Sequence, residues 1–139
     1  MPDVDSLEPD SVQSTEVLSR WLFSSKLFNR STLRVRSGAF TPQRSLRSGD
    51  LETSVYRTSG LTEHQIWPLA QLRPGLTLHG RADLKANDVE TTGLTVVPET
   101  SNHPRHANIL GWSDDEADQL QKKTELARMA RLLLKDDNN

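Results

Sequence analysis

The sequence predicts an α+β fold with a small mixed or antiparallel sheet of about four to five strands, three short helices and a longer C-terminal helix. Short segments of alternating apolar and polar residues are typical of strands, and segments that begin at helix-capping residues lie between them. The C-terminal segment begins with several acidic residues and continues with a stripe of apolar side chains, a pattern that is typical of a longer helix.

The chain length predicts one domain. The chain has 139 residues, of which 34% are hydrophobic and 26% are charged, so the core is expected to be small. Residues 1–13 contain acids, Pro and Ser with few apolar side chains, which predicts a disordered acidic tail. Residues 136–139 are expected to fray, which leaves a single domain over residues 14–135.

The first half of the chain is expected to form a helix and two strands. Ser14 can cap a helix over residues 15–25, whose apolar side chains fall on one face at helical spacing. Alternation predicts strands over residues 33–40 and 51–58, joined by a loop over residues 41–50 that contains Ser, Pro and Gly.

Capping signals and further alternation predict the second half. Thr62 and Gln65 have the spacing of a capping box and predict a short helix, which Pro68 is expected to shorten or kink. The C-terminal helix is expected to begin at the capping box Ser113–Glu116 and to continue to about Leu134. The other expected elements are a strand over 76–82, a helix over 84–92 capped by Asp83 and ended by Gly93, and strands over 94–97 and 106–110.

Charge is unevenly distributed, although the net charge is only -2. Between Arg20 and Arg47 the chain has seven Lys or Arg residues and no Asp or Glu. Arginine suits bidentate phosphate contact, so the segment predicts a phosphate or nucleic-acid surface, whereas the simpler interpretation is a solvated face balanced by acids elsewhere. The predicted contact residues are Arg30, Arg34, Arg36, Arg44 and Arg47.

The segment from His103 to Asn108, with sequence HPRHAN, is the strongest local candidate for chemistry. Histidine exchanges protons near neutral pH, and arginine stabilises charge on phosphate oxygens. His106 with Arg57 and Arg81 therefore predicts a catalytic site for phosphoesters or nucleotides, which a carboxylate such as that of Glu99 could assist. The alternative is structural, with His106 capping a strand and Arg57 paired with an acid.

Composition disfavours several other classes of site. The absence of cysteine excludes disulfides, thiolate metal sites and a cysteine nucleophile. Two histidines three residues apart lack further ligands at a motif spacing, so no metal and no cofactor are expected. The three tryptophans are far apart in sequence and are expected to be core or rim residues. No apolar run of about 18 residues and no signal-peptide pattern are present, so we expect no membrane contact and a cytoplasmic location.

Four short motifs lie in the second half of the chain: Ser54–Arg57 (SVYR), Gly80–Leu84 (GRADL), Gly93–Pro98 (GLTVVP) and His106–Trp112 (HANILGW). In these motifs the chain resembles a set of small bacterial proteins without an assigned function. The resemblance covers more than half of the chain and implies a compact domain of bacterial or phage-related origin. It implies no particular activity.

These observations predict a non-enzymatic binding or regulatory module of a bacterial multi-protein system, of the defence or toxin–antitoxin type. No complete catalytic motif is present, and the charged terminal helix could dock a protein partner through Leu120, Ala127 and Leu134. The alternative is a small enzyme or effector that acts on phosphoesters, nucleotides or nucleic acid through His106, Arg57 and Arg81. Nucleic acid is a second candidate partner through residues 20–47, and the sequence does not indicate an oligomeric state.

Overall fold

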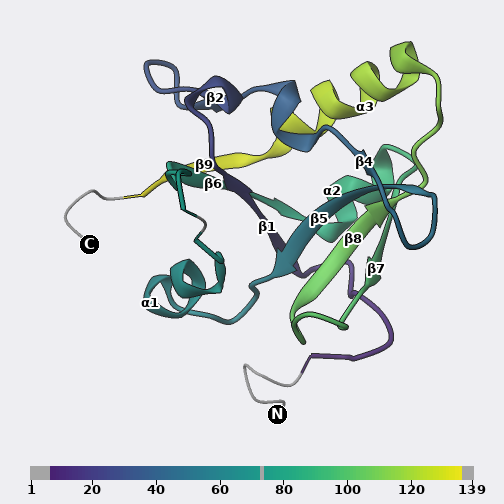
Figure 1. Ribbon diagram of the computed structural model, residues 1–139, viewed down its shortest axis with the longest axis horizontal. Coiled ribbons are helices and arrows are strands. Elements are labelled where there is room, and N and C mark those ends of the chain that lie inside the picture. The colour runs from purple at the N-terminus through teal and green to yellow at the C-terminus, as the bar shows by residue number, and fades with distance from the viewer. Residues whose placement is uncertain (1–6, 73, 136–139) are drawn as a thin grey trace.

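The computed structural model describes residues 7–72 and 74–135, which fold around one antiparallel sheet of seven strands (Figure 1). Strand β4 (Gln43–Arg44) pairs with β5 at one end, and a separate hairpin consists of β2 (Phe28–Asn29) and β3 (Arg34–Val35). The α+β class and the antiparallel sheet are confirmed, with more strands than expected. In spatial order the other six strands are β7 (Thr95–Pro98), β8 (His106–Leu110), β5 (Leu51–Arg57), β1 (Val17–Leu22), β6 (Gly80–Lys85) and β9 (Arg131–Leu134).

The helices are short except for the last one. The sheet is accompanied by α1 (Glu63–Ile66), α2 (Ala86–Thr91), α3 (Glu116–Met129) and the 3₁₀ turns η1 (Ser25–Leu27), η2 (Ser37–Phe40) and η3 (Trp67–Leu69). The predicted capping box is present, because Thr62 Oγ1 accepts from the Gln65 N–H and Gln65 Oε1 accepts from the Thr62 N–H. Pro68 lies in η3, where the α-helix has already ended. No helix in the described ranges is long and apolar enough to span a bilayer.

The helix predicted over residues 15–25 is wrong, because this segment contains β1, a central strand of the sheet. β1 is paired with β5 on one side and with β6 over its whole length on the other. Leu18 and Leu22 are fully buried, and the intervening Ser19 is also fully buried on the opposite face. The apolar spacing fits a helix locally, but hydrogen bonding to β5 and β6 pairs the backbone along both edges of the strand.

Three other boundaries differ from the prediction. Residues 33–40 form the two-residue β3 followed by the turn η2, rather than one strand. The strand predicted over 76–82 begins at Gly80 and runs to Lys85, so Asp83 lies inside β6 and does not cap α2. Gly80 is required there because a Cβ atom would lie 2.6 Å from the Leu133 carbonyl oxygen of β9.

The C-terminal helix is shorter than predicted at both ends. Its N-cap is Asp115, whose side chain accepts from the Asp118 N–H, rather than Ser113. It ends at Met129, and the next residues form β9 against β6. Leu132 and Leu134 pack against the core from this strand, a position that a continued helix would not give them. The strands expected over 51–58, 94–97 and 106–110 are present, as is Gly93 with φ 91° after α2.

The two faces of the sheet differ in composition. We call one the apolar face, with the side chains of Leu18, Val55, Ala82, Ala107 and Ile109, all at most 1% exposed. Helices α2 and α3 cover this face through Val89 and Leu126, which belong to the same core cluster. We call the other the ring face, which carries Ser19, Trp21, Ser54, Tyr56 and His106 by strand alternation and register. The turn α1–η3 contacts one end of the ring face through Glu63 and Trp67, and the loop before β8 contacts it through Glu99 and His103.

The ends of the chain are partly outside this description. Within the predicted N-terminal tail, Val12 packs against the core, and the Ser11 carbonyl accepts a hydrogen bond from Arg57. Residues 1–6 and the predicted frayed end at 136–139 lie outside the described residues.

Candidate active site on the ring face

Ser54, His106 and Glu99 form a continuous line of hydrogen bonds on the ring face. Strands β5 and β8 pair Tyr56 with His106 and Ser54 with Asn108, so Ser54 is the diagonal neighbour of His106 on the same face. Ser54 Oγ lies 2.6 Å from His106 Nε2. His106 Nδ1 lies 2.8 Å from the Glu99 carbonyl oxygen and 3.3 Å from the Glu99 carboxylate.

The Glu99 carbonyl determines which nitrogen of neutral His106 carries the proton. A carbonyl oxygen can only accept, so Nδ1 is the donor, and Nε2 is left with its lone pair. The Ser54 hydroxyl then donates to Nε2. Hydrogen bonds from Ser101 hold the pKa of Glu99 below its usual value, and the charge of His106 acts in the same direction. The arrangement is that of a hydroxyl, a base and an orienting acid.

Tyr56 and His103 border this line. The Tyr56 ring meets the His103 and His106 rings edge-on at 5.5 Å between centroids, and burial raises the pKa of the Tyr56 phenol. His103 Nδ1 accepts from the Arg105 N–H, so neutral His103 carries its proton on Nε2. Burial, followed by the charges of Arg105 and His106, lowers the pKa of His103, which favours this neutral donor form.

A row of rings crosses the face from Tyr56 toward α1. Tyr56 lies 5.7 Å from Trp21, and Trp21 lies 6.5 Å from Trp67, measured between ring centroids. The Arg81 guanidinium lies 4.7 Å from the Trp67 centroid. The buried Trp21 Nε1 has no hydrogen-bond partner among the described atoms. The tryptophans predicted to be separate core or rim residues therefore include two neighbours in one row.

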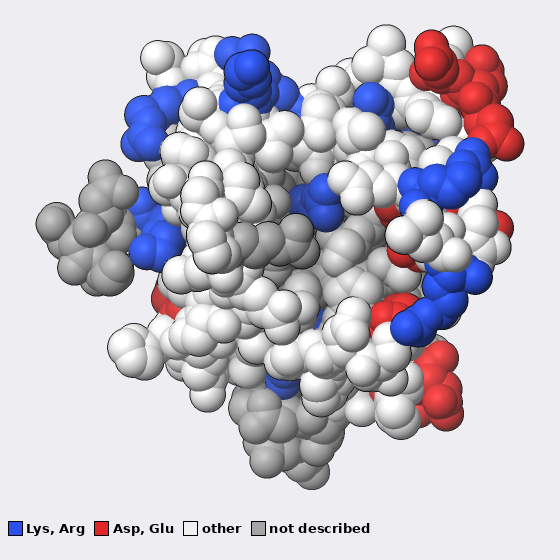
Figure 2. Space-filling view, in the orientation of Figure 1, with Lys and Arg blue, Asp and Glu red and all other residues white. Residues whose placement is uncertain are grey.

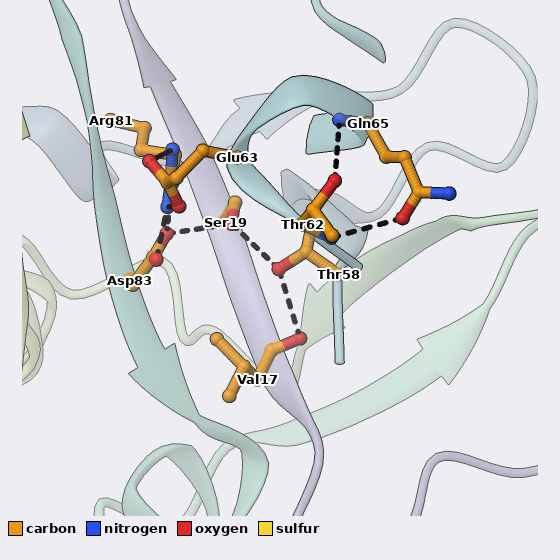
Figure 3. A network of polar contacts seen from close by, with 8 residues as sticks. All are labelled: Val17, Ser19, Thr58, Thr62, Glu63, Gln65, Arg81 and Asp83. Carbon is orange, nitrogen blue, oxygen red and sulfur yellow. Dashed lines mark hydrogen bonds and ion pairs between the residues drawn. The ribbon is translucent and has the colours of Figure 1, made fainter. Parts of the chain in front are cut away.

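A polar network holds α1 onto this end of the ring face (Figure 3). Arg81 donates to both carboxylate oxygens of Glu63, at 3.0 and 2.6 Å, and to Asp83. Ser19 bonds Asp83 at 2.6 Å and Thr58 at 2.8 Å, which continues the network across β1 to the end of β5 (Figure 3). The hydrogen bond from Arg81 lowers the pKa of Glu63. Arg81 is 2% exposed and has carboxylate partners, so its charge is already balanced.

Arg57 lies on the other side of the sheet from His106. Register pairs His106 with Tyr56, so the next residue, Arg57, points to the apolar face. Its guanidinium, fully buried, donates to both oxygens of Glu16 at 2.7 and 2.8 Å. The three residues predicted as a catalytic set are thus separated. His106 belongs to the hydrogen-bonded line from Ser54 to Glu99, Arg81 lies under α1, and Arg57 is in the ion pair with Glu16.

Two other arginines, Arg20 and Arg47, contact the residues that form the hydrogen-bonded line from Ser54 to Glu99. Strands β1 and β5 pair only at Leu18–Arg57 and Ser19–Tyr56 and then splay apart, as Figure 1 shows. Arg20 fills this gap and donates to the Ser54 carbonyl at 3.0 Å and the Ala39 carbonyl at 2.9 Å.

Burial lowers the pKa of Arg20, and no carboxylate in the described chain pairs with it. Arg47 lies 3.7 Å from the Glu99 carboxylate and is largely exposed.

The remaining predicted contact residues occupy two different places. Arg44 pairs with Asp114, whereas Arg30, Arg34 and Arg36 are exposed around the β2–β3 hairpin. The predicted docking residues do not share a surface: Ala127 is buried in the core, Leu134 belongs to β9, and Leu120 is 53% exposed on α3.

Sequence reasoning missed Ser54, Tyr56 and Trp21 as members of this site. Ser54 and His106 both lay in predicted strands, but strand order and register decide whether they meet. A hydroxyl on one predicted strand and a histidine on another were the only signals available.

Two further features complete the description. A cavity of about 600 Å³ lies beside His103 and is also lined by Arg57, Thr100, Pro104 and Arg105. Across the described ranges no three His, Asp or Glu side chains converge in a way that could hold a metal ion. Comparison with models of protein families, with curated proteins and with solved structures finds no match for this chain.

Proposed function

We propose that the ring face is the active site of a small enzyme that cleaves phosphoester bonds, with Ser54 as the nucleophile and His106 as the general base. The observation that carries the proposal is the hydrogen-bonded line from Ser54 Oγ through His106 to Glu99, with distances of 2.6 and 3.3 Å to the side chains. The tautomer set by the Glu99 carbonyl leaves Nε2 able to accept the hydroxyl proton.

The chemistry has two balanced steps. Ser54 Oγ attacks phosphorus while its proton passes to His106 Nε2, and the bond to the leaving alcohol breaks as that oxygen takes the proton from Nε2. Water then attacks the phosphorylated serine and gives a proton to Nε2, which returns it to Ser54 Oγ as the phosphate product leaves. The Glu99 carboxylate beside Nδ1 stabilises the imidazolium that forms in each step.

A phosphoester is favoured over a neutral ester by the nearby cations. Arg20 donates to the Ser54 carbonyl and has no carboxylate partner in the described chain, but its side chain leaves β1 on the apolar face, so its charge acts on Ser54 through the β5 backbone and not by contact with the substrate. Arg47 adds a second guanidinium on the Glu99 side. Charge on phosphate oxygens is the charge that such groups stabilise best.

The row of rings favours a substrate with a planar group. Tyr56 and Trp21 are half-buried on the ring face, where the short α1 and η3 contact Trp21 through Trp67, and Tyr56 contacts His106 directly. Aromatic side chains on an exposed sheet face are the usual platform for stacked bases. We therefore expect nucleotide-type phosphoesters to be better substrates than aliphatic ones.

The test is hydrolysis of bis(p-nitrophenyl) phosphate and of a dinucleotide by the purified chain. His106→Ala and Ser54→Ala should each lower turnover by about 100-fold or more, because acid–base and nucleophilic groups contribute at least this much. The matched controls are His64→Ala and Ser14→Ala, which remove the same groups at exposed positions outside the Ser54–His106–Glu99 line.

A phosphoryl group on Ser54, detected by mass spectrometry after rapid quenching, would support the nucleophile assignment. Equal turnover by His106→Ala and the unmodified protein, with both folded by circular dichroism, would overturn the proposal.

The second candidate is the non-enzymatic regulatory module expected from the sequence. The observation that favours it is β9, an edge strand with three consecutive leucines that follows a charged helix. An edge strand can pair with a partner strand. Absence of hydrolysis together with a stable complex that Leu133→Lys disrupts would favour this function over the enzyme.

A further inference from the structure

The β2–β3 hairpin carries a group of cations that the proposed active site does not use. We call the segment from Lys26 to Arg36 the basic hairpin. Its four cations, Lys26, Arg30, Arg34 and Arg36, are all exposed, and none of them pairs with an acid in the described part of the chain. This distinguishes them from the three other cations of the same sequence window.

Those three cations already have protein partners. Arg44 pairs with Asp114, Arg47 with Glu99, and Arg20 donates to two backbone carbonyls. The sequence window that was predicted to form one phosphate surface is therefore divided. Within this window, only the basic hairpin presents exposed cations without a carboxylate partner in the described chain.

The distribution of acids sharpens this division. Figure 2 shows Lys and Arg side chains around the end of the molecule where Figure 1 places β2, whereas the large Asp and Glu clusters lie on the opposite side. On that opposite side basic and acidic side chains lie next to one another (Figure 2). No Asp or Glu occurs between Val17 and Gly49, so the hairpin has no acid of its own.

The way in which the hairpin is anchored turns its cations outward. Phe28 and Val35 face each other in the hairpin register and are 4% and 7% exposed, because they pack into the core. Alternation then directs Arg34 and Arg36, the neighbours of Val35, away from the protein. Arg30 lies 6.0 Å over the Phe28 ring, which restricts its guanidinium near the surface.

The tip of the hairpin has an unusual backbone conformation. Leu33 has φ 55° and a side chain that is 61% exposed. A branched apolar residue in the left-handed region is strained, and an exposed position does not compensate it by burial. Leu33 directly precedes β3, so this conformation belongs to the turn that connects the two short strands between Arg30 and Arg34.

We propose that the basic hairpin binds the phosphate backbone of nucleic acid. Three of its four cations are arginines, whose planar fork matches phosphate oxygens. A lipid surface fits less well, because Leu33 is the one largely exposed apolar side chain in the described hairpin and membrane-binding surfaces need a broader apolar face. This inference is independent of the hydrolytic site, since it uses different residues and predicts binding rather than turnover.

The experiment measures fluorescence anisotropy of labelled single-stranded and duplex DNA and RNA with the full chain over a series of salt concentrations. Four phosphate contacts predict a slope near -4 for log K against log salt on duplex, and thus an affinity loss on the order of 100-fold between 50 and 200 mM salt. Arg30→Gln with Arg34→Gln should reduce the magnitude of the slope by about 2, at about 0.9 per contact.

The control variant combines Arg44→Gln with Lys122→Gln. It changes the net charge by the same amount, but both residues are paired with acids, Arg44 with Asp114 and Lys122 with Asp118. The proposal requires this variant to keep the affinity and salt slope of the unmodified protein. Thermal unfolding of both variants checks that each remains folded.

Three results would overturn the inference. One is the absence of binding to every nucleic acid at 50 mM salt. The second is an equal loss of affinity in the hairpin and control variants, which would mean that net charge alone is responsible. The third is binding to phosphatidylserine vesicles without binding to nucleic acid, which would assign the hairpin to a membrane surface.

Discussion

The two faces of the central sheet belong to the same strands but carry different kinds of side chain. On the apolar face, Leu18, Val55 and Ile109 pack against α2 and α3 and are fully or almost fully buried. On the ring face, the residues next to them in sequence, Ser19, Ser54 and Asn108, make side-chain hydrogen bonds. A one-residue step along a strand therefore separates apolar packing from polar chemistry.

The two faces also contribute differently to stability. Burial of apolar area is the main stabilising term, and on this protein it is concentrated on the face covered by helices. The ring face keeps a polar line from Ser54 to Glu99, an indole N–H without a partner and a row of half-buried rings. The fully buried apolar side chains of the central strands lie on the other face, and this contrast is the basis of the active site that we propose.

The two buried arginines give the largest test of this comparison. Arg57 lies on the apolar face with Glu16 as partner, whereas Arg81 lies on the ring face with the 60% exposed Glu63 and the 15% exposed Asp83. Arg57→Met leaves the buried Glu16 carboxylate without its cation and should lower the free energy of unfolding by about 3–5 kcal/mol. Arg81→Met should cost less, because water can solvate the exposed Glu63.

Urea denaturation measures both variants, and Glu16→Gln combined with Arg57→Met should recover part of the loss. Equal destabilisation by the two single variants would show that exposure of the partner does not decide the cost.

Neighbouring residues of β1 give a test of intermediate size. Leu18→Ala removes a fully buried side chain from the apolar face and should destabilise by about 3 kcal/mol. Ser19→Ala removes a fully buried hydroxyl that bonds Asp83 and Thr58 and should cost about 1–2 kcal/mol. The ratio of the two values, from denaturant midpoints at unchanged slope, measures how unequally the faces contribute. A larger loss for Ser19→Ala would contradict the assignment of the apolar face as the main core.

The smallest expected effect is a pH dependence from His103 on the ring face. Burial lowers the pKa of folded His103 below the value of about 6.5 in an unfolded chain. The unfolded state then binds more protons below about pH 6.5, so the free energy of unfolding should fall as the pH is lowered from 6.5 toward 5.5 and stay level above it. His103→Gln should reduce this slope, and His64→Gln at an exposed position should not. An unchanged slope in His103→Gln would assign the dependence to other groups.

Local sequence patterns predicted an element correctly where neighbouring residues alone determine its structure. The capping box at Thr62, the left-handed Gly93 and the strand over 106–110 follow from side chains within a few positions. In contrast, residues 17–22 have a helical spacing and form a strand, because β5 and β6 pair with them from distant parts of the chain. Arg131–Leu134 likewise leave the helical pattern to pair with β6.

The candidate site divides in the same way. The sequence by itself determined that His106 begins a strand, that Glu99 lies in the preceding loop and that the cations between 20 and 47 have no acid among them. Only the tertiary structure decided that Ser54, rather than Arg57, meets His106, that Trp21 lies between Tyr56 and Trp67, and that four cations of the basic hairpin have no acid partner in the described chain. The physical reason is that strand register is set by packing between segments far apart in sequence, and a shift of one residue exchanges every side chain between the two faces.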